Sequence, residues 1–293
     1  MVDQRIRPPS EAAHCSVLIR TYFCGGDGDK KQIATASGFF SRLDDTIFLI
    51  TNWHVVTGRH PERPRQTLPG IPMSPTHLSY ALVASDRTPI ELPLVPLYIE
   101  GEPIWRESPE GFEQVDLIAI PMAPVREQNV YTWVERFAPY IDKALSPGVE
   151  VCLIGYPFGL TPSNPFPVWK RAMVSSEPSL PLEGRRCVFL DMPGRPGMSG
   201  SPVYFVGPGF RVTPEEGAAL HSGDLDRMIG TYLSIPSERM ADSLPVLEFA
   251  GVYSGSYGDE NLDRLNLGRF WPAYHLKEIG TTPRRGRNPY PPV

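Results

Sequence analysis

The sequence lacks three features, each of which would indicate a class of function. No apolar run reaches the roughly 18 residues that are needed to cross a bilayer. The first residues, MVDQRIRPPSEAAHC, hold charges and prolines in place of an apolar signal core. A formal net charge of −5 and a pI of about 5.7 give no basic footprint for nucleic acid. We therefore expect a cytoplasmic protein with neither a membrane nor a nucleic acid as its partner.

Cysteine is also scarce. The four cysteines follow no CxxC spacing and form no cluster with histidine: Cys15, Cys24, Cys152 and Cys187. The sequence therefore indicates neither a zinc site nor a redox motif. We expect free, mostly buried thiols, and neither a metal ion nor an organic cofactor.

Turn-forming residues are abundant instead, with 26 glycines and 34 prolines separating short apolar segments. Segments such as TIFLIT and EVCLIGYP are rich in the residues that favour strands. They show no regular alternation with helical patterns, which argues against a parallel α/β fold. The sequence therefore predicts an all-β protein, either a sandwich or a pair of barrels, with one helix between its two strand-rich halves and a second helix near the C-terminus.

The boundaries follow from these patterns. We place one unit at 1–280, with a first strand-rich half at about 15–125, a connecting segment at about 126–147, a second strand-rich half at about 148–262 and the C-terminal helix at about 270–280. The helix in the connecting segment corresponds to TWVERFAPYIDKAL, residues 132–145. Segments 59–76 and 207–247 are long enough to be functional or mobile loops. The basic, proline-rich residues 281–293 are expected to be a disordered tail.

The stretch MPGRPGMSGSPVY, residues 192–204, is the first candidate for chemistry. Ser199 lies between Gly197 and Gly200, which permit tight backbone turns. The N–H groups of Gly197 and Ser199 would then point at one oxyanion. The same run also fits a plain turn. A serine nucleophile further needs a base and a group that orients the base.

His54 and Asp116 are the best candidates for these two roles. A strongly apolar strand runs into His54 in TIFLITNWHVV, which places the ring near a strand end. Asp116 begins the buried-looking strand VDLIAIP, where a carboxylate needs a hydrogen-bond donor such as an imidazole N–H. Taken singly, each residue also fits a purely structural role. The other histidines lack a comparable context: His14, His60, His77, His221 and His275.

In the order His54, Asp116, Ser199, the three motifs resemble those of trypsin-like serine peptidases of the chymotrypsin fold. The sequence is most similar to the bacterial HtrA-like branch. The resemblance covers about residues 15–280 and includes LITNWHVV, VDLIAIP, LIGYPFG, GMSGSP and GVYSGSYG.

The resemblance implies that the two strand-rich halves are two packed antiparallel β-barrels, at about 15–125 and about 148–262, with an inter-barrel helix and a C-terminal helix. It also implies a serine endopeptidase that acts on proteins or peptides through an acyl-enzyme. His54 would be the general base and then acid, Asp116 would orient His54, and Ser199 would attack the carbonyl. The N–H groups of Gly197 and Ser199 would form the oxyanion hole. Ser254 would support Asp116, although it also fits an ordinary strand serine. The implied substrate cleft consists of Pro193, Gly194, Arg195, Gly255 and Ser256.

The departures from the family are informative. Met198 stands where digestive relatives have an aspartate that pairs with a newly cut N-terminus, so that zymogen switch is absent. The cysteine pairs of secreted relatives and a PDZ domain are also missing. Ser201 replaces a second glycine, which adds only a small side chain. Pro193 stands where trypsin-type enzymes have a pocket aspartate, so we predict a small or medium apolar residue before the scissile bond.

Two alternatives remain. An α/β-hydrolase would need Gly two residues after the nucleophile and a histidine later in the chain, but Ser201 is there and His54 comes earlier. A catalytically silent, peptidase-like binding module stays open, because the flexible GRPGMSG loop can leave the three residues unaligned. A regulatory protein partner that contacts segments 59–76 and 207–247 would then order this loop.

Overall fold

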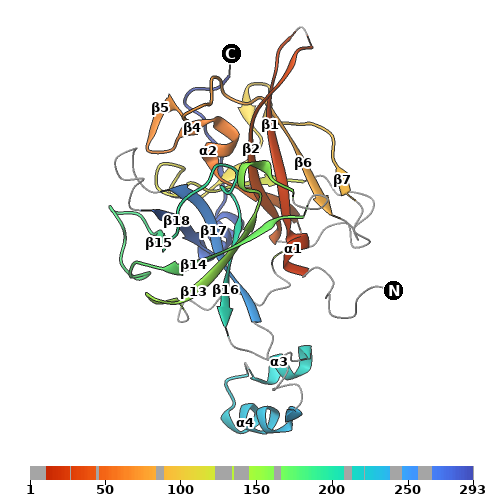
Figure 1. The fold of residues 1–293 in the computed structure, drawn as a ribbon, viewed down its shortest axis with the longest axis vertical. Helices are drawn as coiled ribbons and strands as arrows, with labels where there is room; N and C mark the ends of the chain where they lie inside the picture. The colour runs from red at the N-terminus through yellow and green to blue at the C-terminus, as the bar shows by residue number, and fades with distance from the viewer. Residues whose placement is uncertain are drawn as a thin grey trace.

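The computed structural model describes residues 11–26, 28–43, 46–83, 89–122, 134, 145–161, 166–207, 213–220, 222–237, 246–256 and 266–292. Most of its regular structure is β-strand and the helices are short, which confirms the mostly β architecture (Figure 1). The apolar segments recognised in the sequence are the strands of the two halves. Among the described residues, no helix is both long and apolar enough to cross a membrane.

The first half of the chain, together with the late strand β19, forms an open antiparallel sheet. Its nine strands within the described residues run β19-β11-β12-β3-β2-β1-β6-β7, with β8 beside β6. This order does not close on itself, so the described residues of this half form a sheet where we expected a closed barrel. The strands are β1 (Ser16–Cys24), β2 (Lys30–Leu43), β3 (Thr46–Thr51), β6 (His77–Val83), β7 (Pro89–Glu91), β8 (Val95–Pro96), β11 (Arg106–Glu107), β12 (Ile118–Pro121) and β19 (Arg284–Arg285).

The second half is a closed barrel. In the part of the chain that is described, six strands pair in the order β13-β14-β15-β18-β17-β16, all antiparallel. Their inward side chains, including Leu153, Val203 and Phe270, are fully buried. The strands are β13 (Glu150–Gly155), β14 (Val168–Val174), β15 (Val188–Asp191), β16 (Pro202–Gly207), β17 (Val246–Ser256) and β18 (Leu267–Pro272).

A shared apolar core joins the two halves. Phe39 and Ile50 from the first sheet pack in one buried cluster with Ile154, Val252 and Trp271 from the barrel. Removing this apolar surface from water is the main force that holds the halves together. The junction is therefore a fixed place where residues from both halves can meet.

Short elements decorate this frame. Two small hairpins pair β4 (Arg59–His60) with β5 (Arg63–Thr67) and β9 (Tyr98–Ile99) with β10 (Glu102–Pro103). The first hairpin lies in segment 59–76, which we had expected to be an irregular loop. The helices are α1 (Glu11–Cys15), α2 (Trp53–Thr57), η3 (Pro157–Gly159), α3 (Pro214–Leu220), α4 (Leu225–Ser234) and α6 (Tyr274–Thr281).

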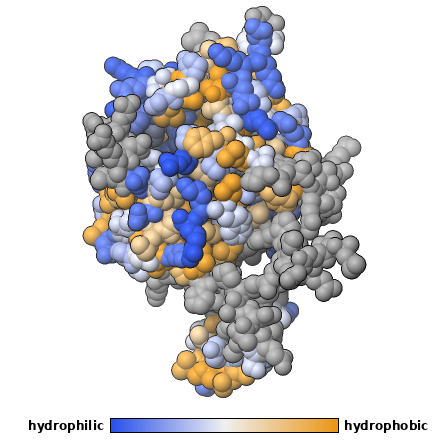
Figure 2. Space-filling view, viewed as in Figure 1, coloured by the Kyte–Doolittle hydropathy of each residue, from blue (hydrophilic) through white to orange (hydrophobic). Residues whose placement is uncertain are grey.

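Helices α3 and α4 occupy segment 207–247, where the sequence showed only a long mixed loop. The Asp224 side chain caps α4 by accepting hydrogen bonds from the backbone N–H groups of residues 226 and 227. Both helices lie beyond the end of β16 and away from the barrel (Figure 1). Figure 2 shows apolar surface on this part of the molecule. It belongs to exposed side chains of α4: Leu225, Ile229, Tyr232 and Leu233.

The two expected helices have different outcomes. Residues 132–145 lie outside the described residues except for 134 and 145, so the inter-barrel helix stays a prediction. Helix α6 lies where the C-terminal helix was expected. All four thiols are free, and three of them are buried, as expected.

The prediction of a disordered tail is wrong for residues 281–292. Strand β19 pairs with β11, and the Trp53 indole N–H donates a hydrogen bond of 2.7 Å to the Arg287 carbonyl. Arg287 also stacks on Phe112 and pairs with the buried Glu107. The basic, proline-rich composition of this segment did not predict its packing, because these basic residues have buried or half-buried partners in a distant part of the chain.

Candidate active site

The Ser199 loop is tied to the first sheet through Ser37. The Ser37 N–H donates to the Ser199 carbonyl (2.8 Å), and its hydroxyl donates to the Gly197 carbonyl (2.7 Å). The backbone bends sharply at Gly197 (φ 90°) and Gly200 (φ 85°). A Cβ on Gly200 would overlap the Ser37 carbonyl, so only glycine fits there. The buried Met198 side chain anchors the loop in the barrel core.

His54 and Asp116 form a buried pair at the edge of the first sheet. Strand β3 ends at Thr51, and helix α2 then presents His54. The imidazole Nδ1 lies 2.6 Å from Asp116 Oδ2, and the His54 backbone N–H donates to Asp116 Oδ1 at 3.0 Å. The Asn52 side chain donates to the Asp116 carbonyl at 2.8 Å. These bonds fix the ring so that Nε2 faces away from the carboxylate.

Ser254, from β17 of the barrel, completes the surroundings of Asp116. Its hydroxyl donates to Asp116 Oδ2 at 2.5 Å. Burial by itself would raise the pKa of Asp116, but the charge and hydrogen bond of His54 and the hydrogen bond of Ser254 outweigh burial and lower it. Asp116 has only 1% of its surface exposed. Its lowered pKa means that the carboxylate is ionised at neutral pH.

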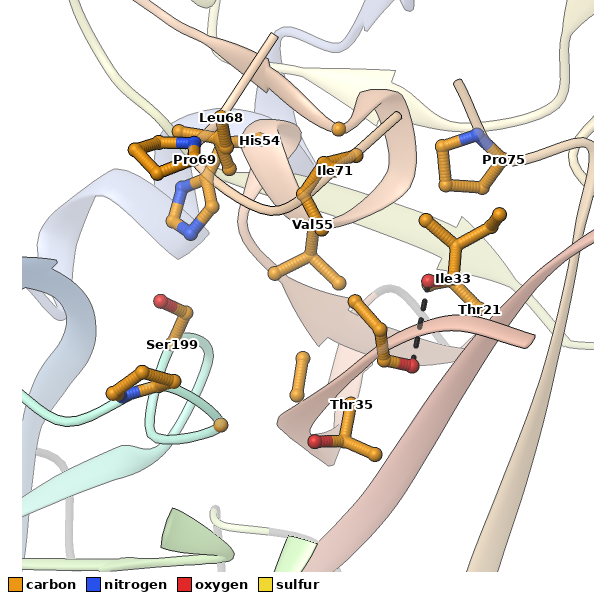
Figure 3. Close-up of a pocket in the computed structure, with 15 residues that line it drawn as sticks. Thr21, Ile33, Thr35, His54, Val55, Leu68, Pro69, Ile71, Pro75 and Ser199 are labelled. Atoms are coloured by element: carbon orange, nitrogen blue, oxygen red, sulfur yellow. Dashed lines mark hydrogen bonds between the residues drawn. The ribbon is translucent and has the colours of Figure 1, made fainter. Parts of the chain in front are cut away.

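Ser199 lies beside this pair. Figure 3 shows its hydroxyl on the side of the loop that faces the His54 ring, and both residues line one cavity. No hydrogen bond joins Ser199 to His54 within the described residues. In proteins without substrate such contacts are often long, and they tighten when substrate binds. The structure thus brings His54, Asp116, Ser254 and Ser199 to one place.

The loop that holds Gly197 and Ser199, the candidate oxyanion donors, contacts η3. The Phe158 N–H donates a 2.7 Å hydrogen bond to the Pro196 carbonyl. In a trans peptide the Gly197 N–H points opposite to that carbonyl, so it faces away from Phe158. Among the described residues, the N–H groups of Gly197 and Ser199 have no hydrogen-bond acceptor. Phe158 holds its position with a left-handed backbone (φ 54°), which is uncommon for a non-glycine residue.

The implied substrate cleft is narrow at one point. A Cβ on Gly194 would overlap the Ser256 side chain and lie 3.1 Å from the Ser256 backbone nitrogen. The segment 193–195 therefore packs directly against the end of β17. Arg195 stays exposed, and the Lys170 ammonium donates to the Pro193 carbonyl at 3.3 Å. Gly255 lies next to Ser199, since a Cβ there would lie 3.5 Å from the Ser199 hydroxyl.

The open space lies elsewhere, in a cavity of about 170 Å³ that sequence reasoning missed. Its walls come from β2, α2, the loop before β6 and the nucleophile loop, and the contributing residues include Ile33, Thr35, Val55, Leu68, Ile71 and Pro75. Figure 3 shows Ser199 and His54 on one side of this space and Ile33 and Pro75 on the other. The prediction that segment 59–76 is a long loop was the only indication of this cavity in the sequence.

Sequence reasoning also missed an ion-pair network around the buried Arg269. Arg269, in β18, has 6% of its surface exposed and donates to Glu62 Oε1 at 2.7 Å, and Arg185 donates to the same oxygen at 2.6 Å. Burial would raise the pKa of Glu62, but these arginines, Arg269 foremost, lower it. The charge of Arg269 also favours the ionised form of Asp116. Glu62 thereby ties the β4–β5 hairpin to the barrel.

One group of side chains has the spacing of metal ligands. One ligand atom from each of Glu110, His275 and Glu278 lies within 4.8 Å of the others. The Arg186 guanidinium donates to both glutamates, and the buried His275 ring contacts the Arg186 carbonyl at 2.9 Å. A cation already balances the carboxylates, so this group is a structural ion-pair cluster.

The fold and the site together define a class: a mostly β protein with a closed six-strand barrel in its described part and a carboxylate–imidazole pair beside a serine loop. No protein-family model matches the sequence, and no curated protein matches it. Among solved structures, the chain is similar to one titled "Crystal structure of Deg5", with a TM-score of 0.46 and 13% sequence identity, over 91% of this chain and 87% of that chain. At this identity the chemistry has to be argued from the site itself.

Proposed function

We propose that the protein is a serine endopeptidase. The observation that carries the proposal is the buried Asp116, which holds His54 Nδ1 at 2.6 Å while Ser199 shares a cavity with the ring. The nine-stranded sheet would be the counterpart of a first barrel, and the sheet and the closed barrel would meet at the site. Substrates would be proteins or peptides, and no cofactor takes part in the steps below.

The chemistry follows from these positions. Ser199 Oγ attacks the scissile carbonyl carbon while His54 Nε2 takes the hydroxyl proton, and the N–H groups of Gly197 and Ser199 bind the oxyanion. The C–N bond then breaks, and His54 gives its proton to the leaving amine. Water, deprotonated by His54, hydrolyses the acyl-enzyme and returns Ser199. Asp116 keeps the Nδ1 proton in place and stabilises the imidazolium.

The test is labelling with a fluorophosphonate probe followed by intact-mass measurement. We expect one adduct on the wild type, none on Ser199→Ala, and an unchanged adduct on Ser222→Ala, whose serine is exposed and remote from the site. An unlabelled wild type, together with no cleavage of any peptide, would instead favour the silent binding module. A protein that is labelled only in the presence of a partner would favour control by ordering of the Ser199 loop.

A further inference from the structure

The cavity beside Ser199 lies on a different side of the nucleophile from β17. Gly255 flanks the Ser199 hydroxyl but does not line the cavity, whereas His54, Gly197 and β2 do. His54 is the group that protonates the leaving amine in the proposed mechanism. The residue on the amine side of the broken bond must therefore lie beside the imidazole, which is where this cavity opens.

The lining of the cavity indicates what fits inside. Apart from Ser199 and His54, the lining is largely aliphatic, with residues such as Ile33, Leu68 and Ile71, and none of the lining residues is acidic, lysine or arginine. A cavity of about 150 Å³ with aliphatic and aromatic walls is known to hold a molecule of the size of benzene. The 170 Å³ here therefore matches one large apolar side chain.

The backbone beside the cavity supports an extended chain. Residues 30–39 of β2 pair with β1, and β3 pairs only with residues 39–43. The other edge of residues 33–36 has no strand partner in the described part of the sheet. An unpaired strand edge is the usual place for an extended peptide to add.

We propose that this cavity is the main specificity pocket of the protein, and that it takes a large apolar side chain from the residue directly after the scissile bond. The inference rests on the proposed endopeptidase function and makes it more specific. The contact between Gly194 and Ser256 leaves little room before the bond, so selection shifts to the leaving-group side. This is a property separate from the small apolar residue that we expect before the bond.

The test is to map the cleavage sites in a complex peptide library by mass spectrometry. For the wild type we expect Leu, Ile, Phe or Met to be enriched at least tenfold over Gly, Asp and Lys at the first position after the cut. Ile33→Asp puts a carboxylate into the cavity, so it should reduce cleavage before apolar residues at least tenfold and favour Lys or Arg there. Gln32→Asp is the matched control, because Gln32 is the exposed neighbour on the same strand and lies outside the cavity.

Leu68→Asp repeats the test from a loop on the opposite wall, should Ile33→Asp lower the melting temperature too far. A labelled and active protein with no preference after the cut would overturn the inference and leave the proposed function intact. So would a preference that neither Ile33→Asp nor Leu68→Asp changes. A protein without cleavage and without a Ser199 adduct would overturn both.

Discussion

At the scale of single residues, Asp116 shows how a side chain that is costly to bury becomes useful. It is almost fully buried, yet it receives hydrogen bonds from His54 and Ser254, and the buried Arg269 adds a favourable charge. These partners compensate for the loss of water. The ionised carboxylate then fixes one tautomer and one orientation of His54.

Replacing Asp116 by Asn should therefore disable Ser199 without unfolding the protein. We expect the rate of fluorophosphonate labelling to fall by roughly 10⁴-fold, since Asn fits the space but no longer stabilises the imidazolium. Ser254→Ala removes only one donor and should cost about tenfold. Labelling kinetics with melting curves would check both. Equal labelling rates for wild type and Asp116→Asn would contradict the proposed role of the pair.

Glu107 is a second buried carboxylate, and here the effect of burial on the pKa exceeds that of the neighbouring arginine. Burial raises its pKa to about 7, and Arg287 only partly offsets the burial. Between about pH 4.5 and 7, Glu107 is therefore protonated in the folded protein and ionised in the unfolded chain. Because the folded state binds the extra proton, the free energy of unfolding falls by up to about 3 kcal/mol as pH rises through this range. Urea unfolding at pH 5 and pH 7.5 measures this contribution.

In Glu107→Gln this fall should disappear, because no proton is bound. Glu100→Gln is the control, since Glu100 is exposed and its replacement should leave the pH dependence of the wild type. If Glu107→Gln kept the full slope, the pKa assigned to Glu107 would be wrong.

At the scale of elements, the short turn η3 contacts the Ser199 loop, which forms the oxyanion hole in the proposed mechanism. Its contact is a backbone N–H at Phe158, in a left-handed conformation that proline cannot adopt and glycine adopts easily. Sequence patterns do not reveal such a contact, because LIGYPFG and GRPGMSG are more than thirty residues apart. Only the closure of the barrel brings them together.

Phe158→Pro should misalign the Pro196–Gly197 peptide and lower turnover by about 10²-fold to 10³-fold, the cost of losing one oxyanion donor. Phe158→Gly keeps both the N–H and the backbone angle, so its turnover should stay near that of the wild type. Comparing kcat between the two variants shows whether the hydrogen bond from the Phe158 N–H or the aromatic ring is responsible for the effect. Equal loss in both would assign the effect to the aromatic ring and not to the hydrogen bond.

At the scale of the whole molecule, the last residues of the chain hold the first sheet together. Strand β19 adds to β11, and Arg287 reaches Glu107, Phe112 and Trp53. Without this segment, Glu107 would be a buried charge without its partners. Breaking such a buried pair usually costs about 3–5 kcal/mol.

Deleting residues 283–293 should therefore lower the melting temperature by roughly 5–10 °C. A chain that ends at Tyr290 is the control, because it keeps every contact named above and should melt like the full chain. Differential scanning calorimetry compares the two. If the longer deletion melted like the full chain, the packing of this segment would contribute nothing to stability.

The sequence by itself determined the strands and the candidate site residues. Strand-forming residues alternate over short runs between turns, and the histidine, aspartate and serine motifs are each local, so they can be read without knowing the fold. The same local patterns did not predict the ion pair between Glu62 and Arg269 or the strand at 284–285.

The tertiary structure alone decided the rest. The tail packs on the first sheet, that sheet stays open over the described residues, and η3 contacts the Pro196–Gly197 peptide, because each depends on partners far away in the chain. The apolar cavity also arises only where β2, α2 and the 68–75 loop meet. Local composition cannot encode such encounters, since long-range packing chooses which surfaces touch.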